Sequence, residues 1–265
     1  MKFSKSLKVG LIMAICAYIP VNASAWGMLG HRIVGQVAET YLNSKSRKAV
    51  KNILGDETLA MTANWPDFIK SDTSYNYLSS WHYVNLPANL DRQGVVDFLN
   101  REKTPNVYNK IQEMISILKN KQSNADQKKL ALRLLVHMVG DLHQPMHTAR
   151  KEDLGGNKVY VTWFGQKSNL HSVWDSGLVD YQQLSYTEYA TVINHPTKAQ
   201  LKSWRATSLA DNVFESYQLV DKIYAKTRAE DKLSYRYNFD FVDHLNEQLL
   251  KGGVRLANIL NEIYG

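Results

Sequence analysis

The sequence has only one cysteine, Cys16, and it lies in the N-terminal segment. If that segment is removed on export, no thiol remains to form a disulfide or to bind a metal. This excludes a thiolate zinc finger and a disulfide-stabilised scaffold. Stability must then come from a hydrophobic core or from bound metal, and any metal site must use histidine, aspartate, glutamate or backbone donors.

The sequence also lacks an apolar run long enough to remain as a membrane anchor. The stretch from Val9 to Ile19 is shorter than the ~20 residues that a membrane-spanning helix needs. It follows a basic start with Lys2, Lys5 and Lys8, and it precedes Ala23-Ser24-Ala25, a small-residue cleavage pattern. These features predict a signal peptide.

We therefore expect residues 1–25 to be a signal peptide and residues 26–265 to be an exported protein, either periplasmic or secreted. A lipoprotein acylated at Cys16 is the weaker alternative, because Ile15 stands where a small residue is expected. Removal of three lysines leaves a mild positive charge, which suits a polyanionic substrate without identifying one.

Repeats, low-complexity tracts and linkers are absent, and most of the chain after Trp26 has the 3.6-residue period of helices. Gly155-Gly156 followed by alternating Val159, Val161 and Trp163 predicts a small hairpin, the only β structure expected. Residues 75–91 are expected to be irregular, and Gly252-Gly253 to interrupt the last helix at a close backbone approach. The pattern predicts one mainly α domain, with helices or helical stripes near 33–41, 50–54, 62–70, 93–101, 106–120, 125–144, 170–181, 186–193, 213–224 and 241–260.

The richest stretch in potential metal ligands runs from His137 to His147. His137 and Asp141 are four residues apart, which places them on the same face of a helix. Pro145 should end that helix near Gln144, so that His147 can turn back toward the same centre. Taken alone, the stretch fits either a single-zinc site or a helix end with buried polar side chains.

Further donors occur elsewhere in the chain, and together they exceed what one ion needs. Zinc takes about four ligands, so the whole set suits two or three ions. Nitrogen and oxygen donors without a thiolate favour zinc. His143, His195 and His244 are assigned mainly to structure, although His143 could orient a ligand. The candidate donors are five histidines, three aspartates and a processed amine: His31, His82, His137, His147, His171, Asp67, Asp141, Asp175 and the amino group of Trp26.

In this order and spacing, the motifs resemble the S1/P1 nuclease family, which comprises zinc-dependent single-strand nucleases and 3′-nucleotidases. Fungal members carry disulfides, so this chain is more similar to bacterial members. The final helix is similar too, at Gly253-Val-Arg-Leu-Ala257. The matching motifs are Trp26-Gly-x-x-Gly-His31, Trp65-Pro-Asp67 with Lys70, Trp81-His-Tyr-Val84, His137-x-x-x-Asp141-x-His143-Gln-Pro-x-His147, Asp153-Leu-Gly-Gly-Asn157 and Leu170-His171-x-x-Trp174-Asp175.

The resemblance implies a helical catalytic domain of the zinc phospholipase C and P1 nuclease type over residues 26–265, with three zinc ions. It assigns the first zinc to Asp67, His82 and His137, and the second to His31 with the amine and carbonyl of Trp26. Asp141 would bridge these two ions, and the third would be bound by His147, His171 and Asp175.

The resemblance further implies hydrolysis of single-stranded DNA and RNA to 5′-phosphate products, with 3′-nucleotidase activity. A monomer is expected. A water that bridges two cations loses a proton near neutral pH and becomes a nucleophile, while a third cation neutralises phosphoryl charge. Asp67, Lys70 and Asp141 are the catalytic candidates, although Lys70 also fits a solvated helix end.

Three residues are candidates for substrate binding: Tyr83, Asn85 and Asn157. Tyr83 follows His82 and could stack on a base of any type. Asn85 stands where many similar sequences carry a carboxylate, so the base preference stays open.

Two alternatives to a nuclease remain. A zinc phospholipase C shares the helical fold, but it is expected to have Asn-Gln-Pro where this chain has His143-Gln144-Pro145, and a glutamate in place of Asp175. A zinc-stabilised binding protein without turnover is disfavoured, because the donors exceed what a structural site needs.

Overall fold

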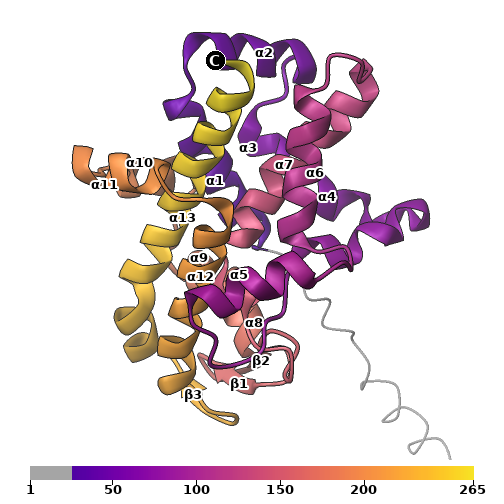
Figure 1. The fold of residues 1–265 in the computed structure, drawn as a ribbon. Helices are drawn as coiled ribbons and strands as arrows, with labels where there is room; N and C mark the ends of the chain where they lie inside the picture. The colour runs from indigo at the N-terminus through magenta and orange to yellow at the C-terminus, as the bar shows by residue number, and fades with distance from the viewer. Residues whose placement is uncertain (1–25) are drawn as a thin grey trace, which may run out of the picture.

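The computed structural model describes residues 26–265, and the predicted signal peptide lies outside the described residues. The expected mainly α single domain is confirmed (Figure 1). The α-helices are α1 (Met28–Tyr41), α2 (Ser44–Leu54), α3 (Leu59–Thr62), α4 (Trp65–Phe68), α5 (Arg92–Arg101), α6 (Val107–Lys119), α7 (Ala125–Leu142), α8 (Leu170–Ser172), α9 (Leu178–Tyr181), α10 (Tyr186–Ile193), α11 (Lys198–Arg205), α12 (Leu209–Ala225) and α13 (Tyr235–Tyr264). The 3₁₀ helices are η2 (Ile69–Ser71), η3 (Thr73–His82) and η4 (Pro145–Thr148), and η5 (Val173–Gly177) is a π-helix.

The predicted hairpin is present as β1 (Tyr160–Trp163) and β2 (Gln166–Asn169), paired antiparallel. Phe164 (φ 48°) and Gly165 (φ 80°) form its two-residue turn, which needs positive φ at both positions. The prediction that this is the only β structure is wrong, because β3 (Lys232–Leu233) pairs in parallel with β1. A two-residue strand that pairs across a long sequence separation leaves no local pattern to read.

The longest helix, α13, runs beside α1 through the molecule (Figure 1). The predicted close backbone approach is found at Gly253, where an added Cβ would collide with Val37 and lie 3.0 Å from the Val34 carbonyl oxygen. The predicted interruption is wrong, because α13 is continuous through both glycines. Their lack of side chains lets α1 pack directly on α13.

The helix that carries most of the candidate ligands, α7, is started by a capping box between Asn124 and Gln127. Its second half, from Leu134 to Leu142, is buried. It ends two residues before Gln144, the predicted end, and Pro145 opens η4, so His147 lies on a short 3₁₀ turn.

Two other segments differ from expectation. Residues 75–82, expected to be irregular, belong to η3, which Asp72 caps through its side chain. The helix α11 was not predicted, because Leu201 and Trp204 are the only large apolar residues in its eight positions.

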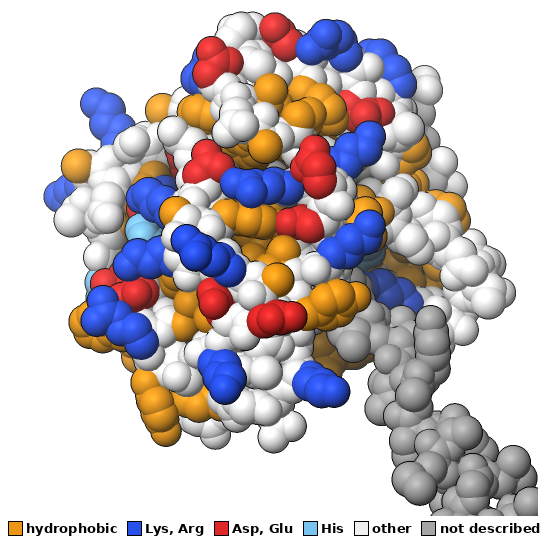
Figure 2. Space-filling view, turned by 90° about the horizontal axis from the view of Figure 1, so that it is seen from below, with side chains coloured by type: hydrophobic (Ala, Val, Ile, Leu, Met, Phe, Trp, Pro, Cys, Tyr) orange, Lys and Arg blue, Asp and Glu red, His pale blue; other side chains and the backbone are white. Residues whose placement is uncertain are grey.

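None of the described helices has the length and apolar character needed to cross a membrane. On the face that carries the hairpin, basic side chains are spread among acidic ones and do not gather in one patch (Figure 2). The candidate site must therefore be found from its chemistry and not from surface charge.

Candidate metal centre

The structure brings His137 and Asp141 of α7 together with His82, the last residue of η3. The Oδ2 atom of Asp141 lies 3.1 Å from His137 Nε2 and 3.0 Å from His82 Nδ1. The two ring nitrogens are 2.9 Å apart. All three side chains are buried, so three potential donor atoms converge where solvent does not compete.

The other carboxylate oxygen of Asp141 faces α1. Its Oδ1 atom lies 3.4 Å from Nε2 of His31, whose ring stacks on His137 at 3.8 Å between centroids. Asp67, from α4, forms a second possible metal-binding group with His31 and His137. The sequence prediction placed Asp67 with His82 and His137. In the structure Asp67 lies in a group with His137 and also with His31, and His137 is shared with the His82 group.

A third group consists of His147 of η4, His171 of α8 and Asp175 of η5. The two oxygens of Asp175 lie 3.4 Å from His147 Nε2 and 3.2 Å from His171 Nε2. His147 also approaches Asp141, with 3.3 Å between Nδ1 and Oδ1. The third group therefore adjoins the other two.

Backbone carbonyls orient three of these histidines. His137 Nδ1 donates to the Ala63 carbonyl, His147 Nδ1 to that of His82, and His171 Nδ1 to that of Gly155, each at 2.7 Å. A carbonyl can only accept, so Nδ1 carries a proton and Nε2 is the ring nitrogen that faces the centre. These three acceptors could not be predicted from the sequence, because a backbone carbonyl has no side-chain signal.

The donor set fits metal ions. Ligands of a tetrahedral zinc lie about 3.3 Å apart when each is 2.0–2.1 Å from the ion. An unpartnered buried polar group costs about 1–3 kcal/mol, which a bound cation would offset. Within residues 26–265, the buried atoms of the candidate histidines and aspartates that make no hydrogen bond are both ring nitrogens of His31, Asp67 Oδ2, Asp141 Oδ1 and His147 Nε2.

The carboxylates hold their charge despite burial. Burial raises the pKa of Asp141, but His137 and His147 outweigh it and hold the pKa well below the usual value. Burial also raises the pKa of Asp175, yet His171 and His147 lower it to about 2. These carboxylates are therefore ionised at neutral pH, as metal ligation requires.

The histidines divide into two kinds. Burial and the neighbouring His137 lower the pKa of His31 to about 4, so its ring is neutral at pH 7. Burial alone would lower the pKa of His147, but Asp141 and Asp175 raise it to about 9. His147 therefore carries a proton in the metal-free protein that a cation would displace.

Trp26 lies at the edge of the centre. Its side chain is fully buried, and the next residue, Gly27, donates its N–H to the Asp175 carbonyl at 2.7 Å. The backbone of Trp26 is thus held next to the third group, and Trp26 stands five residues before His31 in the sequence. Its free amine exists only after cleavage of the bond between residues 25 and 26.

The remaining predicted site residues do not all lie in one place. Lys70 Nζ pairs with Asp67 Oδ1 at 2.6 Å. Tyr83 and Asn85 line one hollow, shared with Lys151 and Leu154. Asn157 does not line it, and its amide donates to the Leu154 carbonyl at 2.8 Å, which stabilises the 154–157 turn.

The ring nitrogens of His143, a possible orienting residue, make their hydrogen bonds to groups other than the candidate ligands. Its Nδ1 donates to the Val139 carbonyl at 2.7 Å, and its Nε2 lies 3.1 Å from Arg255 of α13. Burial and Arg255 lower its pKa to about 3, so it is a neutral acceptor. The neighbouring Gln144 was missed: its amide donates to Asp175 Oδ1.

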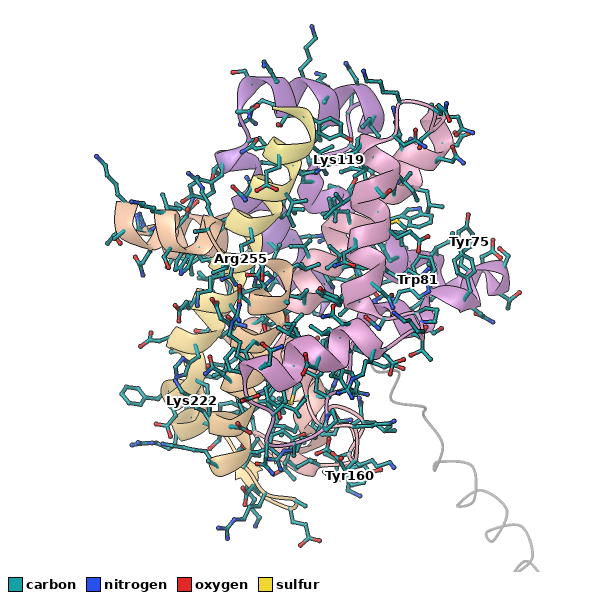
Figure 3. The ribbon with its side chains drawn as sticks, in the orientation of Figure 1. Tyr75, Trp81, Lys119, Tyr160, Lys222 and Arg255 are labelled. Carbon is teal, nitrogen blue, oxygen red and sulfur yellow. The ribbon has the colours of Figure 1, made fainter. Side chains whose placement is uncertain are left out.

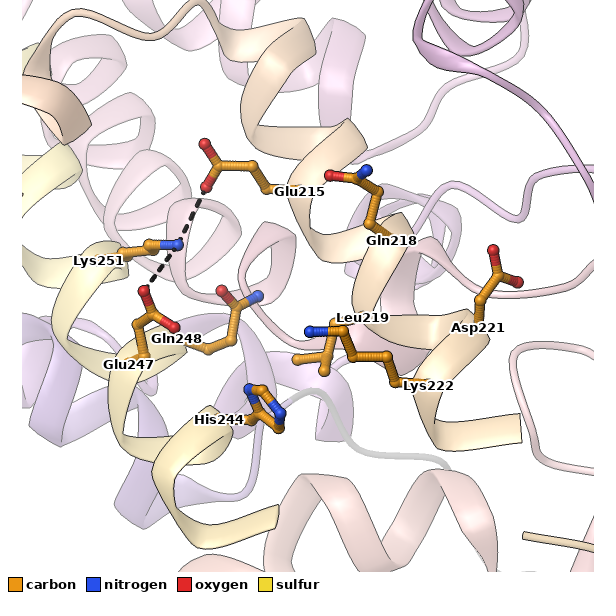
Figure 4. A pocket seen from close by; sticks show the side chains of 9 residues that line it. All are labelled: Glu215, Gln218, Leu219, Asp221, Lys222, His244, Glu247, Gln248 and Lys251. Atoms are coloured by element: carbon orange, nitrogen blue, oxygen red, sulfur yellow. Dashed lines mark ion pairs between the residues drawn. The ribbon is translucent and has the colours of Figure 1, made fainter. Parts of the chain in front are cut away.

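A second hollow lies between α12 and α13 and is separate from the centre (Figure 4). Its lining is charged, and Lys251 pairs there with Glu215 at 3.3 Å and with Glu247 at 3.1 Å. None of the predicted site residues lines it.

Comparison with known proteins shows one family over the described chain. The family model for the S1/P1 Nuclease matches residues 26–265. Endonuclease 3 of Arabidopsis thaliana is 30% identical over 98% of this chain and 96% of its own length. Nuclease P1 of Penicillium citrinum is 27% identical over 91% of this chain and 98% of its own, and Nuclease S1 of Aspergillus oryzae is 29% identical over 71% and 68%.

Proposed function

The chain belongs to the S1/P1 nuclease family and is a hydrolase that acts on ester bonds of nucleic acid; from this and the metal centre, we propose a nuclease with three zinc ions. Its substrates are single-stranded DNA and RNA, cleaved to 5′-phosphate products, and 3′-nucleotides. The observation that carries the proposal is the meeting of three donor groups around Asp141, with buried donor atoms that lack hydrogen bonds.

We assign the ions as follows. Asp67, His82 and His137 bind one zinc, and His31 with the amine and carbonyl of Trp26 binds a second. Asp141 bridges them, since its two oxygens face His31 and the His82–His137 pair separately. His147, His171 and Asp175 bind the third.

When bound, the zinc ions would supply a nucleophilic hydroxide near neutral pH and positive charge opposite the phosphoryl oxygens. The protein's part is to position the donors. Asp141 holds both of its oxygens at fixed places in the buried second half of α7. Lys70, released from Asp67 when that carboxylate binds metal, can direct its ammonium group to the substrate phosphate.

Tyr83 and Asn85 line the hollow next to His82 and are proposed to bind the base. Tyr83 is 40% exposed, which leaves ring surface for stacking. Asn85 offers both a donor and an acceptor where an aspartate would only accept. Asn157 acts indirectly, through the turn that it stabilises.

The protein is proposed to be exported after cleavage following Ala25, which frees the Trp26 amine, and to act as a monomer. The test combines metal analysis of the processed protein with product assays on single-stranded DNA, RNA, 3′-AMP and phosphatidylcholine. We expect three zinc ions per chain and 5′-phosphate products. Lipid hydrolysis without nucleotide release would point to the phospholipase C alternative, and zinc binding with no turnover to a binding protein.

A further inference from the structure

A row of aromatic rings lies on an arm at the side of the molecule, built by α4, η2 and η3 (Figures 1 and 3). The neighbouring pairs are Trp65–Tyr75 at 5.5 Å, Tyr75–Tyr77 at 6.1 Å and Tyr77–Trp81 at 5.3 Å between centroids. These four side chains are called the aromatic row.

The aromatic row is connected to the metal centre at both ends. Trp65 stands two residues before Asp67 on α4, and Trp81 directly precedes His82 on η3. Any chain bound along the row would therefore run close to the metal-binding side chains.

The row lies between the core and the solvent. Trp65, Tyr75 and Trp81 are partly buried and pack against the hydrophobic core, whereas Tyr77 is 51% exposed. The partly exposed rings beside Tyr77 extend its exposed surface into a patch, and such a patch marks an interaction surface. Tyr77, in the middle, has the most ring surface available.

Two cationic side chains lie over rings of the aromatic row. Lys110 Nζ lies 4.1 Å from the Trp81 ring centroid, and the Arg133 guanidinium lies 5.2 Å from that of Trp65. Each cation also pairs with a glutamate, so the positive charge is partly balanced. Stacking rings beside cations is the combination that binds single-stranded nucleic acid without regard to sequence.

We propose that the aromatic row binds unpaired bases of the substrate strand that flank the reacting phosphate. This rests on the proposed function, because it assumes a single-stranded nucleic-acid substrate. The row would add affinity for long strands and none for a mononucleotide, which cannot reach both the metal centre and the row.

The test is Tyr77→Ala, which removes the most exposed ring of the row. We expect KM for a long single-stranded oligonucleotide to rise about fivefold or more, the smallest effect of losing one base–aromatic stack. KM and kcat for 3′-AMP should stay within twofold. Tyr77→Phe should behave as wild type, because the ring is kept.

The matched control is Tyr160→Ala, because Tyr160 is 67% exposed and lies on the hairpin, away from the arm (Figure 3). It should leave both substrates unchanged. An unchanged KM for the long strand in Tyr77→Ala would overturn the proposal and assign the row to another partner. Equal losses on both substrates would also overturn it, since they would mean that Tyr77 only positions His82.

A binding measurement separates this inference from the proposed activity. Fluorescence anisotropy of a labelled oligonucleotide with the chelator-treated full protein needs no turnover. Weaker binding by Tyr77→Ala than by Tyr160→Ala supports the row even if no cleavage is found, and equal binding overturns it. Failure of wild type to cleave either substrate would contradict the proposed function alone.

Discussion

At the scale of single residues, Asp141 is the side chain with the most connections in the centre. Four histidines lie within 3.4 Å of its carboxylate: His31, His82, His137 and His147. Asp141 is fully buried at the end of α7, so water cannot take the place of its carboxylate beside these histidines. Removal of its charge would leave histidines from all three groups without a common anion.

We therefore expect Asp141→Asn to lower kcat/KM more than about 100-fold, beyond the 10–100-fold typical of residues that only support ligands. Zinc content should fall as well, because an amide is a weak zinc ligand. Metal analysis and kinetics on a single-stranded substrate measure both. Asp56→Asn, at an exposed position outside the helices, is the matched control. Near-full turnover with three zinc ions would contradict the bridging role.

His147 predicts how metal binding depends on pH. Its raised pKa, about 9, means that a cation must displace a proton at neutral pH. The apparent zinc affinity of the third group should therefore rise about tenfold per pH unit below pH 9. Competition with a chelator at pH 6, 7 and 8 measures this slope, and an affinity independent of pH would contradict it.

The raised pKa of His147 has the opposite effect on the folding stability of the metal-free protein, which falls as the pH rises. The folded state binds this proton more tightly than the unfolded state, whose pKa is near 6.5. The stabilisation is therefore complete below pH 6.5 and lost as the pH rises through 9. Urea unfolding of chelator-treated protein should show this loss, whereas the zinc-loaded protein should not.

At the scale of elements, the loop of residues 150–157 joins α12 to the third group. Tyr224 of α12 donates its hydroxyl to Asp153 Oδ2 at 2.6 Å, and Asp153 Oδ1 accepts from Gly156 N–H at 2.8 Å. Leu154, Gly155 and Gly156 all have positive φ, between 56° and 80°. The loop thereby presents the Gly155 carbonyl to His171.

Tyr224→Phe tests this positioning. Loss of the hydroxyl frees Asp153 and loosens the loop, so we expect zinc affinity at the third group to fall about tenfold, the lower end of the effect of supporting residues. A chelator-competition titration measures the affinity of the most weakly bound zinc ion. Tyr235→Phe, on a 70% exposed tyrosine, is the matched control. Unchanged affinity in Tyr224→Phe would mean that the glycine conformations alone hold the loop.

Elements with a strong local pattern were predictable, and those that depend on distant partners were not. The apolar stripe of α13 and the capping box of α7 are formed by residues that lie close together in the sequence. The parallel pairing of β3 and the 3₁₀ form of η3 depend on contacts made only in the folded chain. The same holds in the site: ligand types follow from spacing, whereas the carbonyl acceptors and the approach of Asp67 to His31 do not.

At the scale of the whole molecule, the site is assembled from the first and the middle parts of the described chain, while the last third supports it. The helix α13 packs against α1 and α7, which carry His31, His137 and Asp141. Arg255 of α13 is buried and contacts both His143 and Glu215. The last helix therefore helps to fix the distance between α1 and α7, which carry His31, His137 and Asp141, although it provides no candidate ligand itself.

The N-terminus of the processed protein is part of the same arrangement, and this gives the last prediction. Trp26 is buried, and the N–H of its neighbour Gly27 donates a hydrogen bond to the Asp175 carbonyl. The amine of the processed protein would therefore lie within the protein and not in solvent. Extra residues before Trp26 would convert that amine into a peptide nitrogen, which is a poor zinc ligand. We expect such a variant to bind one zinc ion fewer and to lose most activity, as measured by metal analysis and by cleavage of a single strand.

Protease removal of the extra residues should restore both zinc content and activity, which separates loss of the amine from misfolding. A tag of the same length at the C-terminus, after Gly265, serves as the control, because α13 ends there with no candidate ligand nearby. An N-terminally extended protein with full activity and three zinc ions would rule out the amine as a ligand. The remaining donors near His31 would then be Asp141 and the Asp67 and His137 side chains with which His31 forms a group.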